Sequence, residues 1–306
     1  MTIETPLATE RANRFVRFNP IATPSADRVV EPGATAPARK LPKVKRAPRG
    51  LRALVGNVGF IVLEIVALLV VWQAIVWALA VDPNIVPGPI SVLTSLWQLI
   101  QSPLLYTAAG VTLSETLIGF VAGAVLGIGL AIVLSEFPVV EKIANPYIVA
   151  FQAMPKIAIA PLFLIWFGFG LESKVALVIV MVFFPILVNM VVGLKSTSQA
   201  QLELMMVYRA GRLQTLRRLR FYAAMPFLFA AFEVTLVLSL TGAVFAEILG
   251  SGRDIGLGTL LQLYTSKLNV SSMFAIIVVL CLVGILLYAA VKLAARYFLR
   301  WQNPQR

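Results

Sequence analysis

Five ionisable side chains interrupt the long apolar runs of this sequence, and they are the first candidates for functional residues. They are the carboxylic acids Glu64, Glu115, Glu233 and Glu247, and Lys156, which stands between two prolines in MPKIAIAP. Because a charge is costly in hydrocarbon, such residues normally face a protein interior or a wet cavity. Glu233 lies well inside its run and could line a substrate path or bond to a neighbouring helix. Glu247 and Lys156 are expected near the ends of their runs, where side chains reach water.

A second concentration of charge lies in ELMMVYRAGRLQTLRRLRFYAAMP, residues 203–226, which holds five arginines. Leucine or methionine recurs among these arginines. The pattern predicts a basic, half-apolar helix, and one interpretation, which the resemblance given below favours, is that a soluble partner holds it, with Leu213 and Leu216 entering a groove of that partner. A helix lying on the membrane surface, with its arginines on lipid headgroups, is the alternative.

Residue types that enzymes need are missing. The chain has no histidine and one cysteine, Cys281, which rules out an internal disulfide and a Cys/His metal cluster. It has no GxxxxGK[ST] segment to hold ATP phosphates and no HExxH or GxSxG motif. The sequence therefore predicts a protein that is not an enzyme, binds no cofactor or metal, and does not hold ATP in a P-loop.

The composition is that of a membrane protein. Of 306 residues, 59% are hydrophobic and 13% charged, whereas soluble domains are about 25% charged. The net charge of +12 is concentrated in the first 52 residues, in 195–220 and after Lys292, and apolar runs separate these blocks. That distribution indicates positively charged cytoplasmic segments rather than a surface for nucleic acid.

Six apolar runs are long enough to cross the hydrocarbon region. They are 59–80, 105–134, 144–167, 174–194, 224–248 and 272–298. Prolines interrupt the third run and predict a broken helix, and 135–145 is expected to be a polar break. Residues 81–104 predict an amphipathic helix at the membrane surface. Both termini are expected in the cytoplasm, with Lys174 in an outer loop.

These elements give a predicted division of the chain. Residues 1–52 form a disordered, basic, proline-rich cytoplasmic tail, and 53–104 hold the first transmembrane helix and the surface helix. Residues 105–299 form a five-helix core with a cytoplasmic coupling loop at 197–222, and 300–306 form a second tail. Gly119, Gly123 and Gly127 stand four apart and predict close helix packing, within the chain rather than between subunits.

Three passages resemble the permease subunits of binding-protein-dependent ABC importers: VPGPISVLTSLWQLI, the segment from Met154 to Ser196, and residues 203–226 followed by FAEILGSGRDIGLGTLL. They are most similar to the branch that handles nitrate, sulfonates, taurine, hydroxymethylpyrimidine and riboflavin. The resemblance implies an all-α membrane protein with six transmembrane helices and type I importer architecture, in the inner membrane. It also implies as partners a pair of ATP-binding subunits, an extracytoplasmic solute-binding protein, a second permease subunit and membrane lipids.

In that family a cytoplasmic helix with an acidic residue followed by a glycine docks on the ATPase subunit. Glu203 matches the acidic position, Arg209 stands where the glycine is expected, and Gly211 follows. An arginine is expected to keep ordinary backbone angles, so the turn should form around Gly211. Either a more typical permease in a heterodimer, which we favour, or acidic residues on the ATPase would compensate.

The resemblance thus implies coupling residues Glu203, Arg209, Gly211, Arg212 and Leu213, and it suggests pathway residues Glu115, Gln152, Lys156 and Glu233. The substrate would be a small organic anion or a vitamin precursor. A proton-coupled secondary transporter using Glu115 and Glu233 is the alternative, although the two halves show no convincing repeat. A membrane scaffold without transport is a weaker one.

Overall fold

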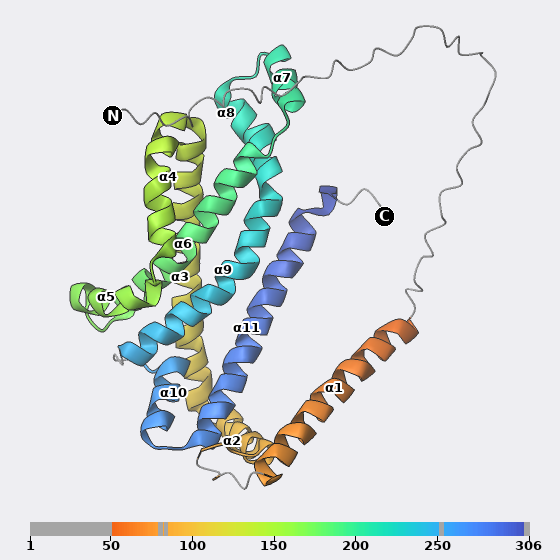
Figure 1. Ribbon diagram of the computed structural model, residues 1–306, viewed down its shortest axis with the longest axis vertical. Helices are drawn as coiled ribbons and strands as arrows, with labels where there is room; N and C mark the ends of the chain where they lie inside the picture. The colour runs from red at the N-terminus through yellow and green to blue at the C-terminus, as the bar shows by residue number, and fades with distance from the viewer. Residues whose placement is uncertain (1–50, 79–81, 83–84, 251–253, 303–306) are drawn as a thin grey trace, which may run out of the picture. The chain divides into compact units, whose positions relative to one another are not determined.

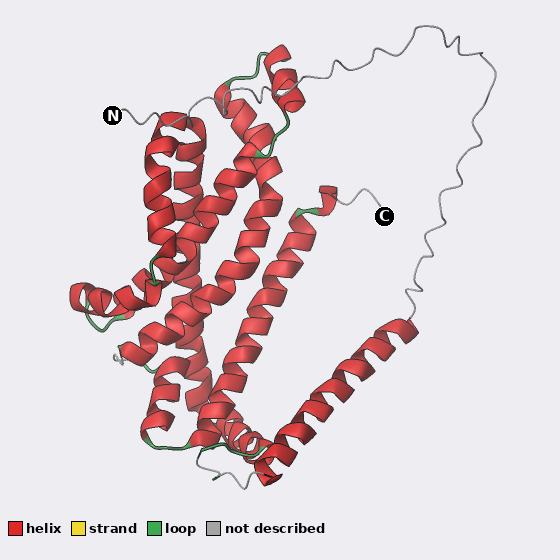
Figure 2. Ribbon diagram, viewed as in Figure 1, coloured by secondary structure: helices red, strands yellow, loops and turns green. Residues whose placement is uncertain are grey.

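A computed structural model describes residues 51–78, 82, 85–250 and 254–302, and all elements in them are helices (Figures 1 and 2). The chain divides into a short unit, 1–57, and a helical unit, 58–306. Except for Leu51 and Arg52, which begin the first helix, the predicted tail at 1–52 lies outside the described residues, as do 303–306. The prediction of an all-α protein is confirmed.

The helices follow one another with short connections. In chain order they are α1 (Leu51–Ala78), α2 (Pro89–Gln101), α3 (Pro103–Glu136), α4 (Pro138–Ala153), η1 (Lys156–Ile159), α5 (Ala160–Phe167), α6 (Leu171–Lys195), α7 (Gln199–Val207), α8 (Arg212–Thr215), η2 (Leu216–Arg220), α9 (Phe221–Leu249), α10 (Leu257–Ser266), α11 (Val270–Phe298) and η3 (Arg300–Gln302). Three of them begin at a proline, because the first helical N–H has no partner within the helix.

The core of the helical unit is formed by α3, α6 and α9. The glycines of α3 let α6 approach closely, as predicted. A Cβ atom on Gly119 would lie 2.5 Å from Val178, and one on Gly127 would lie 2.9 Å from the backbone oxygen of Phe183. A second apolar cluster joins α2, the first turns of α3, α10 and α11. In α2, Val92 and Leu99 are buried there while Leu93 and Trp97 are exposed, so a helix with one buried apolar face does form in 81–104; its position at the membrane surface stays a prediction.

Four described helices are long and apolar enough to cross a membrane, and α4 together with η1 and α5 makes a fifth candidate. This fifth candidate bends by 87° at its break, so the predicted proline-broken helix is confirmed. A break between helices does lie within 135–145, but it is shorter than predicted. Only Phe137 separates α3 from α4, because Pro138 can begin a helix directly. In α1 the described apolar segment, Val66–Ala78, is shorter than a span.

Candidate functional site: an exposed turn and a buried polar network

The predicted coupling loop forms two short helices joined by a tight turn. Ser198 begins α7 with a capping box, in which its hydroxyl accepts the N–H of Gln201 (3.3 Å) and its own N–H donates to the Gln201 side chain (3.1 Å). At the other end, the N–H of Arg209 donates to Met206 O (2.9 Å) and that of Ala210 to Met205 O (3.0 Å). These two bonds form a Schellman motif, which normally places glycine where Arg209 stands.

The expectation that Arg209 keeps ordinary backbone angles and that the turn forms around Gly211 is wrong. Arg209 has a φ of 52°, in the left-handed region, whereas Gly211 has an ordinary φ of −67° as the residue before α8. Left-handed angles cost a residue with a Cβ about 1–2 kcal/mol. The turn is therefore kept in the geometry that suits glycine, because its two hydrogen bonds satisfy the last carbonyl groups of α7.

Large apolar side chains are exposed around this turn. Val207, Tyr208 and Leu213 are 79%, 75% and 76% exposed. Together with the exposed charged residues Glu203, Arg209 and Arg212, the exposed side chains of residues 203–213 are called the coupling surface below. Leu213 was predicted to contact a partner, whereas Val207 and Tyr208 were missed; their signal was a large apolar side chain within an arginine-rich segment between two apolar runs.

The coupling surface is attached to the core without a flexible link. One turn of π-helix, η2, joins α8 directly to α9, and Leu216 packs against the main apolar cluster. Arg220 in η2 forms an ion pair with Glu136 at the end of α3 (3.1 Å). Leu216 was predicted to enter a partner's groove, but here it is half-buried in this chain. The helix α8 is thus connected to α9 through η2 and to α3 through the Arg220–Glu136 ion pair.

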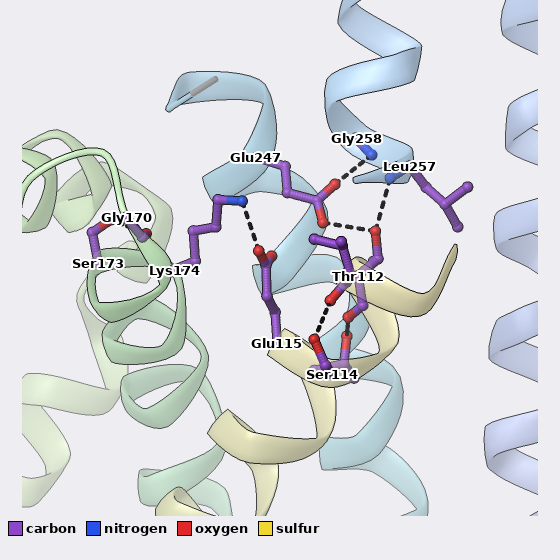
Figure 3. Close-up of polar contacts among 11 residues, drawn as sticks. Thr112, Ser114, Glu115, Gly170, Ser173, Lys174, Glu247, Leu257 and Gly258 are labelled. Carbon is purple, nitrogen blue, oxygen red and sulfur yellow. Dashed lines mark hydrogen bonds and ion pairs between the residues drawn. The ribbon is translucent and has the colours of Figure 1, made fainter. Parts of the chain in front are cut away.

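A network of buried polar groups lies near the other end of the core, where α3, α6, α9 and α10 meet (Figure 3). Lys174 on α6 donates to Glu115 on α3 (2.6 Å), and these residues are 2% and 1% exposed. The second carboxylate oxygen of Glu115 has no hydrogen-bond partner. Lys174 was expected in an outer loop, which is wrong, because α6 begins before it and Glu115 compensates its charge.

Glu247 on α9 belongs to the same network and is fully buried. It accepts hydrogen bonds from the Thr112 hydroxyl (2.6 Å) and the Gly258 N–H (2.5 Å), and Thr112 accepts from the Leu257 N–H (2.8 Å). Side chains of α3 and α9 thus satisfy the first N–H groups of α10. The expectation that Glu247 reaches water at a helix end is wrong. A Cβ on Gly258 would lie 2.6 Å from Val244 O, so the backbone can approach only as glycine.

Comparison with known proteins settles the family. A model for the binding-protein-dependent transport system inner membrane component matches residues 119–300. The chain belongs to this family. The permease is 34% identical to the riboflavin transport permease RibX of Chloroflexus aurantiacus, over 77% of this chain and 87% of RibX. It is also 34% identical to the formylaminopyrimidine transport permease ThiX of Halalkalibacterium halodurans, over 78% of this chain and 94% of ThiX.

Solved structures agree on the fold. An inward-facing MetNI methionine ABC transporter chain matches with a TM-score of 0.57 and 20% identity, over 64% of this chain and 96% of that one. The protein is thus a multi-pass inner-membrane permease subunit of an ABC importer, and a separate subunit hydrolyses ATP. Family membership decides against the proton-coupled transporter. It also implies an ATPase and a binding protein as partners.

The suggested pathway residues of the permease do not form one site. Glu115 lies in the buried network, and Glu233 is half-buried on α9 with no ion pair among the described residues. Gln152 and Lys156 do lie together at the break of the bent span, where the Lys156 ammonium donates to the backbone oxygen of Gln152 (3.3 Å). The same ammonium lies 6.0 Å from the ring centre of Phe184. The pathway assignment stays a prediction.

Proposed function

We propose that the permease couples ATP hydrolysis to alternating access through the coupling surface, which docks in a groove of the ATPase subunit. The observation that carries this proposal is the exposure of Val207, Tyr208 and Leu213 at a helical turn. Large apolar side chains that stay exposed in groups mark interaction sites. Partner ATP binding would then pull η2 and α9, and so shift the balance between inward-open and outward-open states.

We also propose a six-span arrangement with both termini in the cytoplasm, with α1 as the first span and the bent α4–α5 segment as the third. Alternating access at a shared path further suggests a second permease subunit. Since Arg209 keeps the glycine-type turn, the altered sequence alone gives less reason to favour a heterodimer. The oligomeric partner is therefore proposed only as a second permease.

The proposed substrate is a small organic anion or a vitamin precursor. Support comes from the relatives, whose names specify riboflavin, formylaminopyrimidine, aliphatic sulfonates, taurine and nitrate. Lys156, which has no ion pair among the described residues, lies at the break of the bent span. An ammonium group there would suit the negative charge carried by several of these compounds.

The experiment that tests docking compares Leu213→Asp with Leu268→Asp in membranes that also contain the ATPase and the binding protein. These leucines are 76% and 77% exposed, but Leu268 follows α10 at the other end of the core. Because a carboxylate is costly in an apolar groove, Leu213→Asp should lose the co-purified ATPase and the ATP hydrolysis stimulated by loaded binding protein. Leu268→Asp should keep the ATPase bound. Unchanged association in Leu213→Asp would reject the docking proposal.

A further inference from the structure

The backbone at Arg209 does not explain why an arginine stands there. Its φ of 52° and the two hydrogen bonds of the Schellman motif are those of a helix end that glycine or asparagine fills with less strain. Backbone strain of this kind persists where the surrounding structure or a function requires the residue. The reason for the arginine therefore lies in its side chain.

Among the described residues, none forms an ion pair with the Arg209 side chain. Its residue is exposed, and the ion pairs of the described residues use Lys174, Lys195 and Arg220. Glu203, an acidic neighbour on α7, is also exposed and outside these ion pairs. The turn thus presents a guanidinium outward from a rigid position, beside Tyr208, which is 75% exposed.

A carboxylate on a protein suits this arrangement better than a lipid headgroup. A guanidinium binds a carboxylate with two parallel hydrogen bonds, which need a fixed geometry on both sides. The Schellman turn supplies that geometry on this side. An anionic membrane surface would attract Arg209 and Arg212 but would repel Glu203 on the same surface, whereas a protein groove can hold complementary charges for each.

We propose that Arg209 binds an aspartate or glutamate of the ATPase subunit in the docked complex. This inference rests on the proposed docking of the coupling surface and adds the chemistry of the partner residue. It assigns to Arg209 a recognition role in place of the turn-forming role of the family's glycine. The strained angle of Arg209 is then retained because it aims the side chain at the partner.

The test measures the Kd between purified ATPase subunits and the permease in lipid nanodiscs, together with the Tm of the permease. Arg209→Gly and Arg209→Asn both tolerate the left-handed angle without the charge. Each should weaken binding by about tenfold or more while the Tm stays the same or rises by about 2–4 °C. Arg209→Lys keeps the charge but cannot form the paired hydrogen bonds. Its Kd should therefore lie between the wild-type value and the values of Arg209→Gly and Arg209→Asn.

The control is Arg296→Asn, which removes an exposed guanidinium from α11 outside the coupling surface and should change the Kd by no more than about twofold. The inference would be overturned if Arg209→Gly bound the ATPase with wild-type affinity. It would also be overturned if Arg296→Asn lost as much affinity as Arg209→Gly. If wild-type affinity falls to the Arg209→Asn level in nanodiscs without anionic lipid, Arg209 acts through lipid and the inference is wrong. If Leu213→Asp loses affinity for the ATPase and Arg209→Gly does not, the docking proposal stands and only the carboxylate partner of Arg209 is rejected.

Discussion

Three buried ionisable residues meet in one place, Glu115, Lys174 and Glu247, so that two carboxyl groups lie beside one ammonium group (Figure 3). The ammonium group of Lys174 donates to Glu115 (2.6 Å), and Glu247 is bonded to Thr112 and Gly258 instead. Removing one member of a buried charge pair is strongly destabilising when the other stays charged. The cost of a substitution should therefore depend on which charge is removed.

We expect Lys174→Met to lower the free energy of unfolding by about 3–5 kcal/mol, because it leaves Glu115 and Glu247 buried without a cation. Glu115→Gln should cost much less, since Lys174 can still donate to the amide oxygen while Glu247 balances the charge. The stability of both variants is measured by heating the detergent-purified permease and determining the fraction that stays folded by size-exclusion chromatography. A Glu115→Gln variant as unstable as Lys174→Met would show that charge balance does not control this network.

At the scale of helices, the contact of α3 with α6 depends on the absence of a Cβ. At Gly127 a Cβ would lie 2.9 Å from the backbone oxygen of Phe183, which cannot turn away as a side chain can. Gly129, on the same helix, has no atom within 4 Å of its Cβ position. The two glycines therefore separate the cost of crowding from the helix-forming benefit of alanine.

Gly127→Ala should destabilise the permease by about 1–3 kcal/mol, because α6 must move away and lose contacts along its length. Gly129→Ala should be neutral or stabilising by up to about 1 kcal/mol, since alanine favours a helix more than glycine does. The same unfolding assay compares them. Equal Tm values for the two variants would contradict the close helix contact.

The helices were predictable from the sequence because each apolar run is long and ends at a proline, a glycine or a polar cluster. The glycine spacing on α3 also predicted its packed face correctly. Positions that depend on distant residues were not predictable. Lys174 was assigned to a loop because its carboxylate partner is 59 positions away in the sequence, and the angle of Arg209 was misjudged because hydrogen bonds to Met205 and Met206 decide it.

For the whole molecule, the six-span proposal places the two exposed loops of the core on opposite sides of the membrane. Cys281, which is exposed, is first replaced by serine to give a background without thiols. Ile85→Cys, 69% exposed before α2, should then react with a membrane-impermeant maleimide in intact spheroplasts. Val207→Cys, 79% exposed on the coupling surface, should react only after the membrane is opened.

Labelling of both cysteines in intact spheroplasts would contradict the odd number of crossings between these positions. Labelling of Val207→Cys alone would invert the orientation and put the coupling surface out of reach of ATP. The permeabilised sample serves as the control, because both thiols should react there if the variants are folded and the side chains are as exposed as described.

The caps of α10 have a consequence for how the protein is made. Thr112 leaves the ribosome long before Leu257, whose N–H it accepts 145 positions later. Until that contact forms, the first N–H groups of α10 have no acceptor inside hydrocarbon, where an unsatisfied group costs several kcal/mol. Solvent can satisfy these groups in water, and the caps of α10 within the protein form only when α3 and α9 are in place. The end of the bundle that holds the buried network is therefore completed only after α9 and α10 have been synthesised.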